Sequence, residues 1–391
     1  MNILVLHNNT GSRFYRLIPQ LKWMQEKGHK VLLERNDTPH IDEKIAWSDL
    51  VIFQMVFSEE VVDVCRAMGK KVVFECDDLI HKTHELHHAY EETRGWKGWR
   101  FYYRVWRVLR KCDGFISSNE NLRKKYGWMT KRTLVFPNYL SLEHWLKEPK
   151  KNLSTDRVRI LWAGSTSHTI DLNFAQPIIK EILARYPQVQ FIYVGHGGIP
   201  TDDLYARFIY GEDLFKDLPQ SRRESVLAVP PNVWPYRLAA MQADIAIAPL
   251  EKIEFNRYKT QCKYLEYAVN GIPGVYSSWF YTDVKDGMRE CGEERHVGSD
   301  KKHILDSGIA TGLLADTPEE WIAALSLLIE NATLRKRIGE NARKEAIEKY
   351  NIAPHLPEWQ AFLESIYGTT RINDTRSPSL ASQTQVGGER Q

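Results

Sequence analysis

The residues best suited to chemistry in this chain lie between Tyr258 and Ser278, just before a short apolar strand. The polar side chains that recur at helical spacing on one face of this segment are Lys259, Lys263, Glu266 and Asn270. Two cations near the amino end of a helix oppose its dipole unless an anion lies between them. The pattern therefore predicts a phosphate site, and the alternative is a solvated helix face on which Glu266 pairs with Lys263.

A glycine follows the first strand of each half of the sequence. Gly11 lies in NNTGSR, and Gly164 lies in AGSTSHT, where Ser165 adds a hydroxyl group. Glycine lets a phosphate, a sugar or an acceptor approach the backbone, and the free N–H groups of a following helix can bind a diphosphate. An ordinary turn explains each loop equally simply, with a serine such as Ser12 capping the next helix.

Two adjacent carboxylates, Asp77 and Asp78, follow the apolar strand that ends near Cys76. They are expected at the carboxyl edge of a parallel sheet, where ligands bind. A carboxylate there can accept a proton from an acceptor hydroxyl or stabilise positive charge on a sugar ring. Asp77 is the preferred catalytic candidate and Asp78 the structural one, and the alternative makes both of them helix caps.

The segment from Arg94 to Lys111, RGWKGWRFYYRVWRVLRK, combines arginines and aromatic residues in one amphipathic helix. Phe101, Val105 and Val108 form a core stripe, which leaves arginines and several tryptophans on other faces. Such a surface can contact a membrane, a lipid-linked acceptor or nucleic acid. The alternative is a core helix whose arginines reach out to solvent.

A run of histidines lies shortly before that segment, at His81, His84, His87 and His88. Some of them can meet on one helical face, which is the arrangement a metal would need. Solvent-facing or acceptor-contacting histidines are the preferred interpretation, and no metal site is expected.

The elements that position these residues alternate between short β-rich runs and helical segments. The first half offers NILVLH, HKVLLE, DLVIFQM, KKVVFEC, GFISS and TLVFP, and the second offers RVRILWAG, VQFIYVG, SVLAVP, DIAIAPL, GVYSS and GLLAD. This alternation predicts an α/β protein with two doubly wound, Rossmann-like parallel sheets and a cleft between them. The predicted divisions are residues 1–150, residues 151–354, a helix over residues 355–368, and a disordered tail over residues 369–391.

Composition sets limits on the compartment and the partners. The chain has 391 residues, a formal net charge of +3 and five cysteines without a C-x-x-C pair. These features do not indicate nucleic-acid binding, a disulfide framework or a zinc site, and a reducing cytosol suits them best. The first residues read as a strand, so no signal peptide is expected, and no apolar run is long enough to span a bilayer. We expect a cytoplasmic protein, with the inner face of a membrane as a further location, and the sequence does not indicate its oligomeric state.

The motif L-E-Y-A-x-x-G-I-P-G-V, which begins at Leu265, resembles the donor-binding signature of GT-B glycosyltransferases similar to family 4. The resemblance extends from Asn2 to about Tyr367. It implies two facing Rossmann-like domains, the first for the acceptor and the second for the donor, with a last helix that crosses back to the first. It also implies a UDP- or GDP-type nucleotide sugar as co-substrate and a reaction without metal. Tyr258 departs from the family, which commonly has a glutamate at this position that helps to place the sugar.

The resemblance also implies roles for single residues. Glu266 would bind the donor ribose, Gly164 would admit the phosphates, and Asn256 would lie near the sugar or the phosphates. Lys259 and Lys263 would stabilise charge on the leaving diphosphate. The candidate catalytic residues are therefore Lys263 and Asp77.

Rival functions remain open at this point. One is a sugar-nucleotide epimerase of the same architecture. Another is a degenerate family member that binds a carbohydrate or acts as a partner subunit, which the tyrosine substitution would explain. A third keeps the transferase chemistry but uses modified DNA as acceptor.

Overall fold

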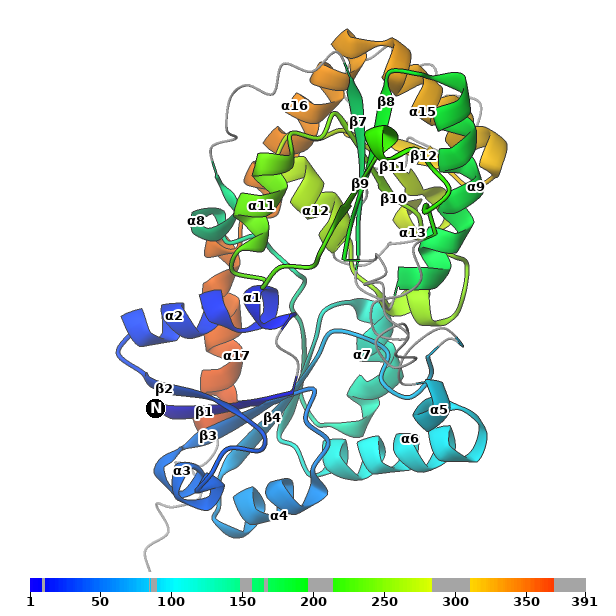
Figure 1. Cartoon of the computed structure of the whole chain (residues 1–391). Helices are drawn as coiled ribbons and strands as arrows, with labels where there is room; N and C mark the ends of the chain where they lie inside the picture. Colours follow the sequence, from blue (N-terminus) through cyan, green and yellow to red (C-terminus); the bar gives the residue numbers. More distant parts are fainter. Residues whose placement is uncertain are drawn as a thin grey trace, which may run out of the picture.

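The computed structural model describes residues 1–8, 11–83, 85, 90–147, 157–164, 168–195, 214–282 and 310–368. Within these residues the chain forms two six-stranded sheets, one from each half of the sequence, with helices around both (Figure 1). Every strand pair in both sheets is parallel. The α/β class and the doubly wound sheets predicted from the sequence are therefore confirmed.

The first sheet has the order β2-β1-β3-β4-β5-β6. Its strands are β1 Asn2–His7, β2 Lys30–Arg35, β3 Leu50–Gln54, β4 Lys71–Cys76, β5 Gly114–Ser117 and β6 Thr133–Val135. Strands β3 and β5 are buried throughout, and β4 is buried after its first residue, because helices cover both faces of a parallel sheet. The order reverses direction at β1, which is the topological switch point where such sheets bind ligands.

Helices connect the strands of the first sheet. They are α1 Arg13–Arg16, α2 Ile18–Glu26, α3 Ile41–Trp47, α4 Glu59–Ala67, α5 Tyr90–Thr93, α6 Gly95–Arg110, α7 Glu120–Tyr126, and the 3₁₀ turn η1 Gly127–Met129. Leu17 separates α1 from α2, and Pro19 takes the second position of α2, where its missing N–H leaves no hydrogen bond unmade.

The second sheet has the order β12-β11-β10-β7-β8-β9. Its strands are β7 Val158–Ala163, β8 Val189–Val194, β9 Arg223–Val226, β10 Ile245–Ala248, β11 Gly274–Ser277 and β12 Leu313–Ala315. The surrounding helices are α9 Thr169–Arg185, η3 Gln220–Arg222, α11 Trp234–Met241, η4 Phe255–Tyr258, α12 Cys262–Val269, α13 Ser278–Thr282, α15 Pro318–Glu330 and α16 Ala332–Lys349.

The chain crosses between the halves at two places that lie side by side. The first crossing leads to α8, Leu142–Trp145, and the second follows α16. Leu140 accepts a hydrogen bond from Ile352 N at 2.9 Å and donates one to Tyr350 O at 2.7 Å, which forms a parallel bridge opposite Asn351. The two crossings are therefore fixed to each other.

The last helix returns to the first sheet, as the sequence predicts (Figure 1). After the turn η5, Ala353–His355, helix α17 runs over Leu356–Gly368. Its buried Trp359 and Leu363 join the core cluster that contains Ile3 and Val5 of β1. The predicted boundary at residue 150 and the tail from residue 369 lie outside the described residues.

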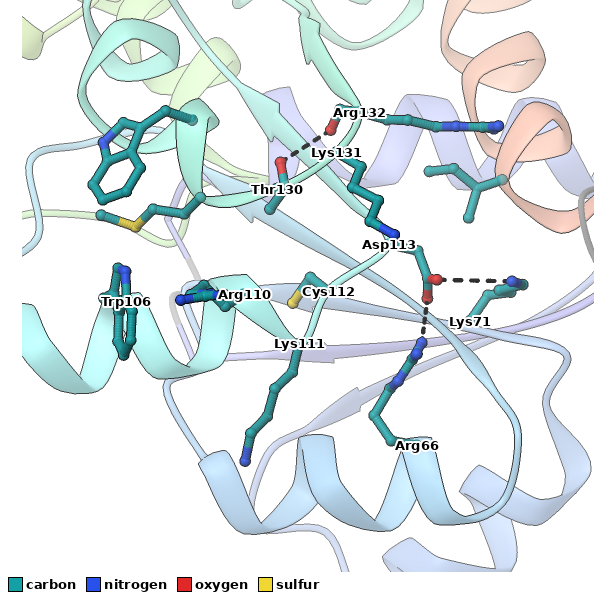
Figure 2. A pocket seen from close by; sticks show the side chains of 13 residues that line it. Arg66, Lys71, Trp106, Arg110, Lys111, Cys112, Asp113, Thr130, Lys131 and Arg132 are labelled. Atoms are coloured by element: carbon teal, nitrogen blue, oxygen red, sulfur yellow. Dashed lines mark hydrogen bonds and ion pairs between the residues drawn. The ribbon is translucent and has the colours of Figure 1, made fainter.

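Two cavities lie at opposite edges of the first sheet. One, of about 230 Å³, lies between the halves at the carboxyl ends of the strands. The other, of about 620 Å³, lies at the amino ends of β4, β5 and β6, beside the end of α6 (Figure 2). Since the fold places ligands at carboxyl ends, the first cavity is the candidate active site.

Candidate functional site

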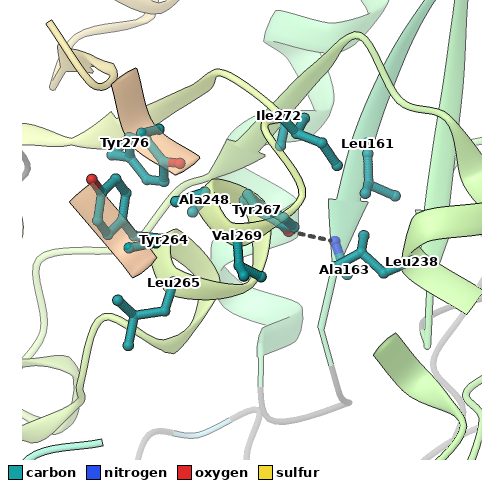
Figure 3. Packing of buried hydrophobic residues seen from close by; sticks show 14 of the residues in the cluster. Leu161, Ala163, Leu238, Ala248, Tyr264, Leu265, Tyr267, Val269, Ile272 and Tyr276 are labelled. Atoms are coloured by element: carbon teal, nitrogen blue, oxygen red, sulfur yellow. Dashed lines mark hydrogen bonds between the residues drawn. The ribbon is translucent and has the colours of Figure 1, made fainter. Parts of the chain in front are cut away.

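Helix α12 presents the signature residues to the cavity because its other faces are packed. Tyr264, Leu265 and Val269 join a buried cluster with residues of β7, β10 and β11 (Figure 3). The hydroxyl oxygen of Tyr267 accepts a hydrogen bond from the backbone N–H of Ala163 in β7 at 3.2 Å. With these sides buried, the amino end of α12 is held against the interdomain cavity.

Lys263, in the first turn of α12, lies in the cavity and meets a histidine. Its Nζ is 3.0 Å from Nε2 of His168, whose Nδ1 is 2.7 Å from Asp171 Oδ2. Burial, together with the charge of Lys259, lowers the pKa of Lys263 to about 8, against the attraction of Asp171. Burial and the two lysines lower the pKa of His168 to about 3, so this imidazole is neutral at pH 7. A neutral histidine beside an ammonium group leaves Lys263 as the charged member of this pair.

Lys259 reaches the same cavity from outside the helix. The prediction that Lys259 lies on the same helical face as Lys263 is wrong. Helix α12 begins only at Cys262, and Lys259 has an extended backbone. Phe255 and Tyr258 pack against the core cluster of the first sheet, which draws this segment away from the helix axis. Lys259 Nζ lies 3.8 Å from Asp78 Oδ2 of the other half.

Tyr258, the position of the family's glutamate, faces the first half instead of the cavity. It packs beside the cluster of the first sheet, and its backbone oxygen accepts a hydrogen bond from Asn119 Nδ2 at 2.7 Å. The tyrosine therefore joins the two halves and does not line the cavity as the structure describes it.

The two aspartates line the cavity from the first half. Burial raises the pKa of Asp78 to about 6 against the attraction of Lys259, and burial also raises the pKa of Asp77 against the attraction of Arg16. Asp77 Oδ1 is buried without a hydrogen-bond partner among the described residues. No helix begins within residues 79–83, so the structure gives the aspartates no helix to cap there.

The loop after β1 contributes Gly11 and Ser12 to the wall of the cavity. Ser12 stands at the N-cap position of α1 but does not cap it with its side chain. Its hydroxyl instead accepts a hydrogen bond from Gln54 Nε2 at 2.8 Å, at the end of β3. The loop is thereby tied to the neighbouring strand across the switch point.

A buried network lies behind the aspartates. Arg16 donates from Nε to Glu75 Oε1 at 2.5 Å and from a terminal nitrogen to Asn138 Oδ1 at 3.0 Å. Asn138 Nδ2 in turn donates to Thr260 Oγ1 at 2.8 Å and contacts Cys262 Sγ at 3.1 Å. Burial raises the pKa of Glu75 to about 7, against the attraction of Arg16. The network connects the floor of the first half to the start of α12.

Glu266 is half-buried one turn further along α12. Its two carboxylate oxygens accept hydrogen bonds from Tyr15 Oη at 2.5 Å and Trp234 Nε1 at 3.0 Å. Burial raises the pKa of Glu266, against these two hydrogen bonds. Tyr15 belongs to α1. A side chain of the first half is therefore hydrogen-bonded to the carboxylate that, by the family resemblance, would bind the donor ribose.

The remaining candidates lie beside the cavity. A Cβ at Gly164 would come within 2.7 Å of the Trp162 ring, so packing alone requires glycine there. Asn256 is buried and donates to Asp171 Oδ1 at 3.0 Å, so it supports the aspartate behind His168. Ser165 lies outside the described residues.

The histidine run contributes one described residue, His81. Its Nδ1 lies 2.7 Å from Tyr126 Oη, and burial lowers its pKa to about 4. The other three histidines of that run lie outside the described residues. The described parts of the chain hold no group of three or more metal-ligating side chains. Among the helices of those parts, none is long and apolar enough to cross a membrane.

The comparisons with known proteins concern the fold. No family model matches the sequence, and no curated protein matches it. A sucrose-phosphate synthase from Thermosynechococcus elongatus is similar in structure, with a TM-score of 0.59 at 13% identity, over 94% of this chain and 100% of that one. An alpha-glucosyltransferase in complex with UDP has a TM-score of 0.58 at 12% identity, over 93% of this chain and 100% of that one. A putative UDP-N-acetylglucosamine 2-epimerase from Listeria monocytogenes has a TM-score of 0.51 at 9% identity, over 94% and 97%.

These similarities, together with the two sheets and the returning helix, show the GT-B fold. The fold expected from the donor signature is thus confirmed. Membership of family 4 stays a prediction. Identities this low do not transfer a substrate or a reaction.

Proposed function

We propose that this protein is a glycosyltransferase that moves a sugar from a nucleoside diphosphate to a hydroxyl group of an acceptor. In this proposal residues 1–150 form the acceptor domain and residues 151–354 the donor domain. The principal support is that Lys259 and Lys263 of the second half share one cavity with Asp77 and Asp78 of the first. Cations on one side and carboxylates on the other suit a reaction in which a diphosphate leaves and a hydroxyl group attacks.

The two lysines would bind the diphosphate oxygens and stabilise the charge that develops as the bond to the sugar breaks. Lys263 is preorganised by His168, which Asp171 holds in place. Lys259 would exchange its distant contact with Asp78 for a phosphate. In this proposal the two ammonium groups stabilise the diphosphate charge in place of a metal ion.

Glu266 would bind the ribose hydroxyls. The ribose then takes the place of the Tyr15 hydroxyl, while the hydrogen bond from Trp234 remains. Asp77 lines the cavity together with Lys259, and one of its carboxylate oxygens is buried without a hydrogen-bond partner among the described residues. Asp77 is therefore the group proposed to act on the acceptor hydroxyl or the sugar ring.

Thermal stabilisation by nucleotides tests the donor site before any acceptor is known. UDP and GDP, each alone, are added to the wild type and to Lys263→Gln, and the shift in Tm is measured. Lys252→Gln is the matched control, since Lys252 is an exposed lysine of the same half, in the loop before η4, and does not line the cavity. We expect one nucleotide to stabilise the wild type and the control but not Lys263→Gln. Equal stabilisation of all three proteins would remove Lys263 from the site.

A sugar-nucleotide epimerase is the second candidate, supported by the similarity to the Listeria epimerase structure. Both reactions bind a nucleotide sugar, but only the epimerase changes it without an acceptor. Incubation with the donor alone, followed by chromatography of the nucleotide sugars, separates them. An epimerised product favours the epimerase, and nucleotide release that requires an acceptor favours transfer.

A further inference from the structure

The larger cavity, at the amino ends of β4, β5 and β6, is the feature that the proposed function leaves unused. Its basic lining residues are Arg66, Lys71, Arg110, Lys111, Lys131 and Arg132, and the acidic one is Asp113. Two tryptophans, Trp106 and Trp128, also line it (Figure 2). An excess of cations around a hollow of this size is typical of a site for a phosphate-bearing ligand.

Part of this charge is already paired within the protein. Asp113 lies 3.0 Å from Arg66 and 3.7 Å from Lys71. Lys111 is bound by carboxylates of α4. No ion pair of the described residues involves Arg110 or Lys131. The Arg110 guanidinium instead lies 4.9 Å from the centre of the Trp106 ring, so these two cations remain available to an anion.

The same surface continues along α6. The residues on the exposed side of this helix are Trp96, Lys97, Trp99, Arg100, Tyr103, Arg104, Arg107 and Arg110. The exposed fractions of Trp96 and Trp99 are 75% and 69%, and that of Trp128, at the cavity, is 63%. No acidic side chain lies on this face of α6. The interpretation of this segment as a core helix alone therefore does not account for its exposed side.

We propose that the cavity at the amino ends of β4 to β6 binds the phosphate headgroup of an anionic lipid, while the exposed face of α6 lies on the bilayer surface. Tryptophan and tyrosine favour the level of the headgroups, and arginines nearby are attracted to anionic lipid. The two cavities are separated by the length of β4, roughly 20 Å for six residues at about 3.3 Å each. The protein would then sit on a membrane with its candidate active site directed away from the contact.

The state of the aromatic rings favours a bilayer over nucleic acid. Tyr103 stacks on Trp106 with ring centres 5.4 Å apart, and Arg107 and Arg110 lie over these two rings. Tyr103 and Trp106, covered in this way, do not offer open faces on which bases can stack, so a continuous row of stacking rings along α6 is interrupted at its centre. Residence at a membrane interface needs only an apolar body and a polar edge, which these side chains retain.

Vesicle flotation with the full chain tests the proposal. The vesicles are phosphatidylcholine alone and an equimolar mixture of phosphatidylcholine and phosphatidylglycerol. We expect binding only to the mixed vesicles, and about 30-fold weaker binding for the double variant Arg110→Gln/Lys131→Gln, because each cation near an anionic surface contributes about a fivefold change. Trp96→Ala/Trp99→Ala should weaken binding to the same vesicles. Lys336→Gln, exposed on α16 of the second half, is the matched control and should bind as the wild type does.

Several outcomes would overturn the proposal. They are equal flotation with phosphatidylcholine alone, undiminished flotation of the Arg110→Gln/Lys131→Gln variant, and no flotation at all. Binding of a single-stranded oligonucleotide that the same variant loses, without binding to vesicles, would assign the cavity to nucleic acid instead. Tm and nucleotide stabilisation of each variant are measured in parallel, so a folding defect is recognised as such and the donor site is tested separately.

Discussion

Donor affinity should depend on pH through Lys263. Its pKa is about 8 in the empty site, so the ammonium form is about nine-tenths populated at pH 7 and about one-tenth at pH 9. If the diphosphate binds the ammonium form, affinity for a UDP- or GDP-sugar falls about tenfold between these two pH values, or about 1.4 kcal/mol. The diphosphate of such a donor does not titrate in this range, so its own charge does not cause the change.

The sign follows from linkage. A bound diphosphate raises the pKa of Lys263 above its value in the empty site, so full affinity is present below pH 8. Affinity then declines as the pH rises through about 8 and becomes constant above the pKa of the bound form. Burial is the main cause of the lowered pKa in the empty site, so the decline requires that Lys263 be as enclosed as the structure shows.

Isothermal titration calorimetry at pH 7, 8 and 9 and constant ionic strength measures this dependence. Lys263→Met should bind weakly at pH 7 and show no decline between pH 7 and pH 9. Lys252→Met, at an exposed lysine in the loop before η4, should keep the wild-type slope. A wild-type affinity that is constant over this range, or a Lys263→Met variant with the wild-type slope, would refute the reasoning.

Three further predictions concern the surroundings of the cavity. Tyr15→Phe removes one hydrogen bond to Glu266, so calorimetry should show that the free protein is about 1 to 2 kcal/mol less stable. The affinity for UDP or GDP should increase, because the ribose no longer has to displace the tyrosine hydroxyl. A reduced affinity would argue against this displacement. Arg16→Met leaves Glu75 buried without its partner, and urea unfolding should show a loss of about 3 to 5 kcal/mol at pH 8. That loss should be smaller at pH 6, below the pKa of about 7 of this carboxyl group, because the protonated form has no charge to bury, and a loss independent of pH would count against this account. Turnover should be unchanged after dialysis against EDTA, and a loss restored by Mg²⁺ or Mn²⁺ would contradict a reaction without metal.

The strands and the meeting of the main polar groups could be predicted because both follow from local patterns. Alternating β-rich and helical segments give parallel sheets, and the carboxyl ends of parallel strands share one edge. Gly11, Asp77 and Asp78 follow strands of one sheet, and they do lie together with Lys259 and Lys263. The helical position of Lys259 was wrong because contacts with the other half override the local spacing.

The contacts that the sequence did not indicate are those between residues that are distant in the chain. Tyr15 and Glu266 are 251 positions apart, and Asn138 meets Thr260 across the two halves. No spacing rule reports such a pair, since it depends on how the halves approach each other. His168 carries a local signal, since it is the first residue with a basic side chain after Gly164 in the loop AGSTSHT.

The bridge between Leu140 and Asn351 limits how the two halves can move. Both connecting strands run through one small region and are hydrogen-bonded to each other, so neither can lengthen or twist without the other. A rotation of one half relative to the other would therefore bend both connections at this bridge, and strain applied between the halves would fall on both of them at once.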